Sequence, residues 1–80
     1  MLIEYVEAAM RHAKYEVLPD QRKYYGEISQ CKGVYASAKN LEECRKQLGE
    51  ILEEWVLVRV YRHLKLPIFD GDKLSVKESA

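Results

Sequence analysis

The sequence contains little cysteine, no excess of charge and no long apolar run, and each absence excludes a class of protein. Its two cysteines, Cys31 and Cys44, are too few for a secreted scaffold of 80 residues, which usually carries about four or more. We therefore expect two reduced thiols and a cytoplasmic location. Thirteen basic residues balance thirteen acidic ones, whereas proteins that bind DNA or RNA unaided usually carry a basic excess.

The sequence also lacks the features of a membrane or exported protein. No stretch reaches the roughly 18 consecutive apolar residues that a membrane span needs. Glu4 and Glu7 stand where a signal peptide would have a basic start followed by an apolar run. A chain of this length holds one core, which is marginal when alone, so we expect a homodimer or a higher homo-oligomer. It carries no cofactor motif, and we expect no cofactor.

The residue pattern predicts a single α+β domain with an antiparallel sheet of three or four strands, covered by one long helix. Asn40 and Glu43 fit the start of that helix, because an N-cap amide and a glutamate three residues later are typical there. Residues 55–61 are β-branched enough for a strand, but no breaker interrupts the helical stripe, so we favour helix. The expected elements are a helix at about 2–12, strands at about 14–18, 23–29 and 34–38, the long helix at about 40–64, an extended segment at 66–70 and a frayed tail at 75–80.

The second predicted strand contains two adjacent tyrosines, Tyr24 and Tyr25. Successive side chains of a strand point to opposite faces of the sheet, so only one of the two enters the core of a sheet covered on one side. The other is available to a partner, and tyrosine is common at the energetic centres of interfaces. Tyr25 shares its face with Glu27, and we predict that these two residues contact the partner.

Three short runs, followed by a fourth, resemble the HicB-like antitoxin family in their order and spacing. The runs are Tyr24 to Ile28, Gly33 to Ala36, Asn40 to Cys44, and Leu66-Pro67-Ile68-Phe69 in place of that family's Leu-Pro-Ile/Val-Pro. The resemblance covers about residues 14–72. It implies a partial ribonuclease-H-like fold and a non-catalytic module that binds and occludes a small ribonuclease toxin of the HicA type.

The sequence departs from the usual pattern of that family at both ends. Antitoxins of this kind usually add a C-terminal helix-turn-helix or ribbon-helix-helix module. Only eleven residues follow Phe69, and we therefore expect no DNA binding. The N-terminal helix is an addition to the commonest pattern, which either forms a self-association surface or extends the core.

A row of polar residues follows one side of the long predicted helix. Its members lie at helical positions i, i+4, i+7 and i+11, and they are Glu43, Gln47, Glu50 and Glu54. The ordinary interpretation is a solvated helix face. In view of the resemblance, the functional alternative is a surface complementary to a basic ribonuclease, whose attraction would speed encounter.

Catalytic interpretations find little in the residue pattern. The strand acids Glu16 and Glu27, with Asp20 in a turn, are too few for two-metal chemistry. Cys44 lies on the apolar helix stripe, where cysteine behaves as a small hydrophobic residue. We expect neither catalytic residues nor a metal site. Two alternatives to the antitoxin-like module stay open, namely a self-associating domain that binds RNA or a ligand, and a weak metal-dependent nuclease.

Overall fold

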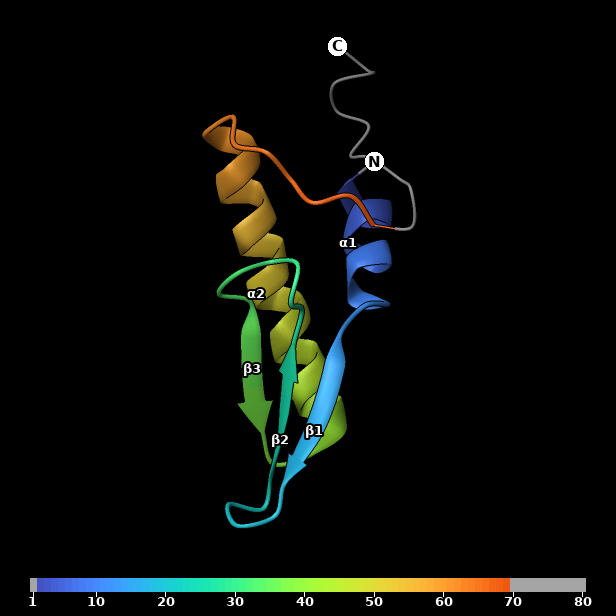
Figure 1. Cartoon of the computed structure of the whole chain (residues 1–80), viewed down its shortest axis with the longest axis vertical. Helices are drawn as coiled ribbons and strands as arrows, with labels where there is room; N and C mark the ends of the chain where they lie inside the picture. The colour runs from blue at the N-terminus through green and yellow to red at the C-terminus, as the bar shows by residue number, and fades with distance from the viewer. Residues whose placement is uncertain (1, 70–80) are drawn as a thin grey trace.

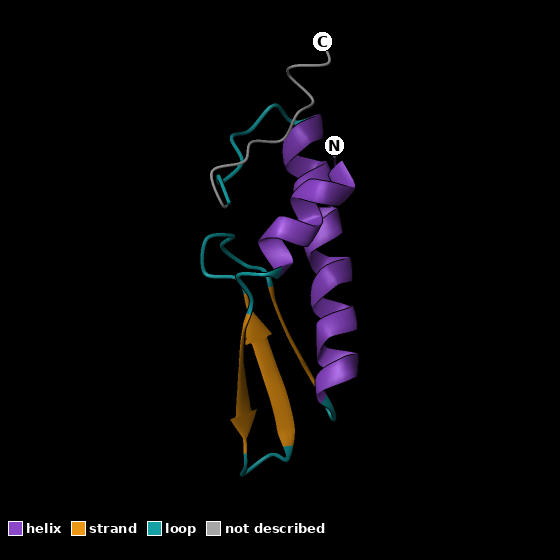
Figure 2. Cartoon of the chain, turned by 90° about the vertical axis from the view of Figure 1, so that its right-hand side faces the viewer, coloured by secondary structure: helices purple, strands orange, loops and turns teal. Residues whose placement is uncertain are grey.

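The computed structural model describes residues 2–69, which build a sheet and two helices (Figure 1). Seen from the side, the long helix covers one face of the sheet, and the other face stays open (Figure 2). This arrangement confirms the predicted α+β architecture. In chain order, the elements are α1 (Leu2–Met10), β1 (Lys14–Leu18), β2 (Lys23–Glu27), β3 (Tyr35–Ala38) and α2 (Leu41–Tyr61).

The long helix α2 starts where the sequence predicts it. The side chain of Asn40 accepts a hydrogen bond of 2.7 Å from the backbone N–H of Glu43, and this satisfies a donor that the first helical turn leaves free. Residues 55–61 are helical, as favoured. The helix ends at Tyr61 rather than near 64, because the chain turns at His63, whose φ of 59° no right-handed helix accommodates.

The sheet is an antiparallel meander in the order β1-β2-β3. Strand β1 has the predicted bounds, but β2 and β3 are shorter than the predicted 23–29 and 34–38. The residues between the two strands form a compact turn. In this turn, Cys31 donates its N–H to the carbonyl of Ile28, and Val34 donates its N–H to the carbonyl of Cys31. Gly33 supplies the positive φ of 90° that this turn requires.

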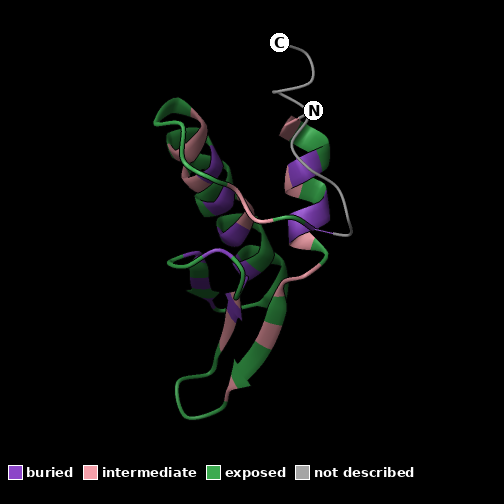
Figure 3. Cartoon of the chain, turned by 45° about the horizontal axis from the view of Figure 1, so that its top comes forward, coloured by how far each residue is buried: buried purple, intermediate pink, exposed green. Residues whose placement is uncertain are grey.

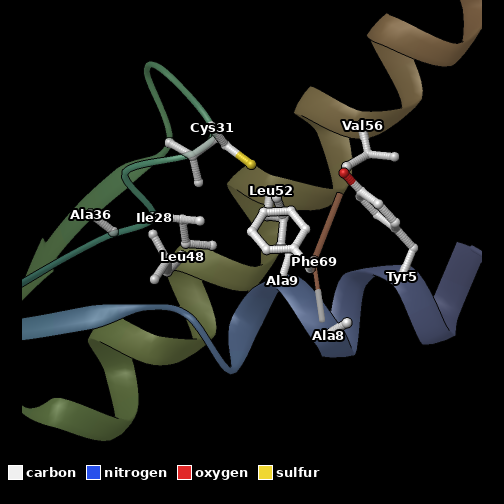
Figure 4. Packing of buried hydrophobic residues seen from close by; sticks show 11 residues of the cluster. Tyr5, Ala8, Ala9, Ile28, Cys31, Ala36, Leu48, Leu52, Val56 and Phe69 are labelled. Carbon is white, nitrogen blue, oxygen red and sulfur yellow. The ribbon is translucent and has the colours of Figure 1, made fainter. Parts of the chain in front are cut away.

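The core lies between α1, the middle of α2 and the turn at 28–34, while the β1–β2 hairpin extends into solvent (Figure 3). Figure 4 shows Leu48 beside Ile28 and Ala36, and the ring of Phe69 beside Leu52. Within the predicted extended segment, residues 66–69 form no strand beyond a single bridge at Phe69. Residue 70 and the predicted frayed tail lie outside the described residues. Neither described helix is long and apolar enough to cross a membrane.

Candidate partner-binding surface

The uncovered side of the sheet, here called the open face, carries both residues predicted to contact a partner. Because Gly26 is buried beneath α2, its neighbours Tyr25 and Glu27 project from the other side. The strand register places further residues on the same side, since Glu16 and Ser37 pair with Tyr25, and Lys14 and Tyr35 pair with Glu27. The open face thus consists chiefly of Lys14, Glu16, Lys23, Tyr25, Glu27, Tyr35 and Ser37.

Two tyrosines form the centre of the open face. The rings of Tyr25 and Tyr35 stack with their centroids 6.2 Å apart and their planes at 27°. Tyr35 keeps 58% of its surface exposed, which is unusual for so large a side chain on a short strand. Sequence reasoning did not select Tyr35. Alternation along β3 was the available signal, but only the pairing with Glu27 brings its ring to Tyr25.

The open face carries charges of both signs, with the carboxylate of Glu27 directly beside the tyrosine pair. The hydroxyl of Tyr25 donates to Oε1 of Glu27 at 3.0 Å. Partial burial raises the pKa of Tyr25 above its usual value, and the hydrogen bond and charge of Glu27, followed by electrostatic interactions with Tyr35 and Glu16, raise it further. The phenol therefore stays protonated near neutral pH. A flat aromatic pair beside two carboxylates suits a cationic group, above all the planar guanidinium of arginine.

The four residues of the polar row on α2 do not join this site. They are all exposed, and they lie on the side of α2 away from its buried row of Cys44, Leu48, Leu52 and Val56. Glu43 and Gln47 line a hollow of about 360 Å³ together with Lys23 and Lys39, where the charge is mixed, and this hollow reaches the edge of the open face at Ser37. The six residues predicted as one partner-binding set thus belong to two surfaces, the open face and the outer side of α2.

The two thiols of the described chain are buried, and their pKa values are raised. Residues 2–69 contain no group of three or more His, Cys, Asp or Glu side chains that could hold a metal ion. Both cysteines are buried and free, and Cys44 donates to the carbonyl of Ala36 at 3.5 Å. Burial raises the pKa of Cys31 to about 11 and also raises that of Cys44. These thiols are protonated at neutral pH, whereas a nucleophilic cysteine needs a lowered pKa.

Comparisons with known proteins agree with this fold and set it in a family. The family model described as UPF0150-like matches residues 4–67. The match includes residues 4–10 of α1. The crystal structure of TTHA0281 from Thermus thermophilus is 39% identical, with a TM-score of 0.82 over 91% of this chain and 93% of that chain. No curated protein matches the chain.

Proposed function

The chain belongs to the UPF0150-like family, and from this membership we propose that it is a non-catalytic protein-binding module of the HicB-like antitoxin kind. Its partner is a small, basic ribonuclease of the HicA type. The module acts by covering the RNA-binding surface of that ribonuclease, so that the bound enzyme no longer reaches its substrate.

The observation that carries this proposal is the composition of the open face. A surface that binds RNA is rich in arginine and lysine, and the same groups are attracted by carboxylates and by the faces of tyrosine rings. The open face offers both, in Glu16 and Glu27 and in the stacked pair of Tyr25 and Tyr35. It therefore presents to the ribonuclease an alternative to the negatively charged and stacking groups of RNA.

Direct RNA binding at the same face is the competing interpretation. Exposed aromatic residues on a sheet stack bases in several RNA-binding domains. Such sheets place basic residues beside the aromatic ones to hold the phosphates, and this face has Lys14 and Lys23 as well as Glu16 and Glu27. The residue hydrogen-bonded to the ring pair is nevertheless Glu27, whose carboxylate repels a phosphate there, so this centre favours a basic group of a protein.

Two sets of variants test the proposal on the full-length chain. The chain is first used to capture its partner from native extract, and a partner counts only if it is near-stoichiometric and has ribonuclease activity after release. Inhibition of that activity is then titrated. We expect Tyr25→Ala with Glu27→Gln to weaken inhibition by at least about tenfold, since tyrosine and paired charges dominate interface energetics. The matched control is Glu50→Gln with Glu54→Gln on α2, which should inhibit like the unaltered chain.

The two sets also show how the proposal fails. Absence of any ribonuclease among the captured proteins would contradict the antitoxin-like role. If the α2 variant loses inhibition and the open-face variant keeps it, the role stands but the surface is the outer side of α2. Circular dichroism on both variants ensures that neither result reflects unfolding.

A further inference from the structure

A second, basic site lies away from the open face, where three distant parts of the chain meet. The turn after β2, the last turns of α2 and the segment after α2 line an open pocket of about 440 Å³. This volume lies within the range of small-ligand pockets. The residues that matter for its chemistry are Ser29, Gln30, Lys32, Trp55, Arg59 and Lys65.

Two hydrogen bonds from α2 fix the walls of this pocket. Trp55 donates its Nε1–H to the carbonyl of Lys32 at 3.0 Å, which holds the turn. Arg59 donates its Nε–H to the carbonyl of Lys65 at 2.8 Å, which holds the segment after α2. The guanidinium of Arg59 also lies over the ring of Trp55, 4.7 Å from its centroid. Its position is therefore set before any ligand arrives, and the terminal nitrogens remain to donate.

The pocket concentrates positive charge in a chain whose formal net charge is zero. Lys32, Arg59 and Lys65 line it, and within residues 2–69 no carboxylate does. A cation in the last turn of a helix is expected, because it offsets the negative end of the helix dipole. That accounts for Arg59. It does not account for Lys32, which comes from the turn after β2, or for Lys65, which follows the helix.

We infer that this pocket binds a phosphate monoester. The planar fork of Arg59 takes two phosphate oxygens, and the ammonium groups of Lys32 and Lys65 balance the dianion as point charges. The hydroxyl of Ser29 donates to Oε1 of Gln30 at 3.3 Å, which leaves the amide N–H groups of Gln30 as neutral donors. The inference is independent of the proposed function, because none of these residues belongs to the open face.

The single tryptophan provides the measurement, because Trp55 stands inside the pocket. The full-length chain is titrated at constant ionic strength with inorganic phosphate and with adenosine 5′-monophosphate. It is also titrated with one short oligoribonucleotide carrying either a 5′-phosphate or a 5′-hydroxyl. Fluorescence and titration calorimetry follow binding in parallel. We expect saturable binding of inorganic phosphate, adenosine 5′-monophosphate and the 5′-phosphorylated oligonucleotide, and much weaker binding of the 5′-hydroxyl oligonucleotide.

Paired variants decide whether the pocket is responsible. Lys32→Gln with Lys65→Gln removes two exposed charges, and we expect affinity to fall at least about tenfold, as for lost charge-assisted hydrogen bonds. The control, Lys39→Gln with Lys46→Gln, removes the same charge elsewhere and should bind normally. Tighter binding of the phosphorylated oligonucleotide than of the mononucleotide identifies an RNA end as the source, and equal binding identifies a free nucleotide. No saturable binding, or equal loss in both variants, overturns the inference.

Discussion

The two faces of the sheet differ most where Gly26 pairs with Ala36, although the covered face also carries the half-buried rings of Tyr15 and Tyr24. Beneath α2 the strands carry Gly26, Ala36 and Ala38, all buried. On the other side the neighbouring positions are Tyr25 and Tyr35, with carboxylates around them. One step of 3.3–3.4 Å along a strand thus separates a position without a side chain from one with a tyrosine.

Because of this difference, residues on one face of the sheet contribute mainly to folding, and their neighbours on the other face are available for binding. On the covered face, size decides what is tolerated, because a Cβ at Gly26 would come within 3.2 Å of Sγ of Cys44 on α2. On the open face Tyr35 stacks beside Tyr25 and keeps 58% of its surface exposed, so its size is less constrained. Substitutions on the covered face should therefore change stability, and those on the open face should change binding.

Truncation at the covered side should give the largest effect. Leu48 has no exposed surface and packs beside Ile28 and Ala36 (Figure 4). We expect Leu48→Ala to lower the free energy of unfolding by about 2–5 kcal/mol, measured by urea denaturation followed by circular dichroism. The control is Ile51→Ala on the same helix, at a side chain 36% exposed, for which we expect a loss under about 1 kcal/mol. Equal losses would show that α2 is not packed as described.

Adding one methyl group beneath α2 should have the next largest effect. The Cβ of Gly26→Ala would lie 2.8 Å from two ring carbons of Tyr15, as well as close to Cys44. We expect a loss of about 1–3 kcal/mol, because the ring and the helix must both shift. Gly49 is a matched control, since the nearest atom to its Cβ position is 4.0 Å away on Met10. Gly49→Ala should stabilise α2 by about 0.5–1 kcal/mol, and destabilisation there would contradict the open spacing.

The pH dependence of the free energy of unfolding should reveal the buried thiol of Cys31. Burial raises the pKa of Cys31 to about 11 in the folded chain, against about 8.5 for a free cysteine. The unfolded chain therefore loses its proton first, so stability is full below about pH 8.5 and falls as pH rises toward 11. We expect this thiol to account for a loss of up to about 3 kcal/mol by pH 11, measured by urea denaturation across that range. Cys31→Ala should remove this pH-dependent loss of stability. An unchanged pH profile in the variant would show that the loss does not come from Cys31.

The rate at which thiols react provides a direct test of which face of the sheet is covered. At pH 8, Cys44 should react with a thiol reagent only as fast as the chain opens, because it is buried and its pKa is raised. Ser37→Cys places a thiol on the open face, and we expect it to react at the rate of an unfolded cysteine. A slow reaction there would mean that the open face is covered.

The smallest effect should follow removal of one hydroxyl from the open face. Tyr25→Phe deletes the hydrogen bond to Glu27, which is only partly buried. We expect the free energy of unfolding to change by less than about 0.5 kcal/mol, at the low end for hydrogen bonds. A loss above about 1.5 kcal/mol would show that the open face contributes to folding and blur the distinction between the faces.

Local patterns were sufficient to predict the fold, but not the ends of its elements. Alternation in residues 24–28 correctly separated Tyr25 and Glu27 from the covered face, and Asn40 correctly marked the start of α2. The errors arose at turns. The 28–34 turn shortens both its flanking strands through its own backbone hydrogen bonds, and a positive φ at His63 ends α2 early. These conformations depend on packing that the sequence pattern does not display.

The candidate sites were predictable only where they follow a single element. Tyr25 and Glu27 share one strand, so spacing places them together. Tyr35 reaches them only through the register of β2 and β3. The basic pocket is less predictable still, because Lys32, Arg59 and Lys65 come from three segments that the tertiary fold joins.

The core contains residues that are far apart in the sequence, such as Tyr5 and Phe69, and this affects when the native state can form. The rings of Tyr5 and Phe69 meet edge to face with their centroids 5.6 Å apart, and the hydroxyl of Tyr5 donates to the carbonyl of Pro67. Tyr5 is translated early, but its contact with Phe69 forms only after Phe69 has been translated. Contacts this distant in sequence also require a large loop to close. A nascent chain that ends before Phe69 lacks a ring that is buried in the core, so the core is complete only after this residue has emerged from the ribosome.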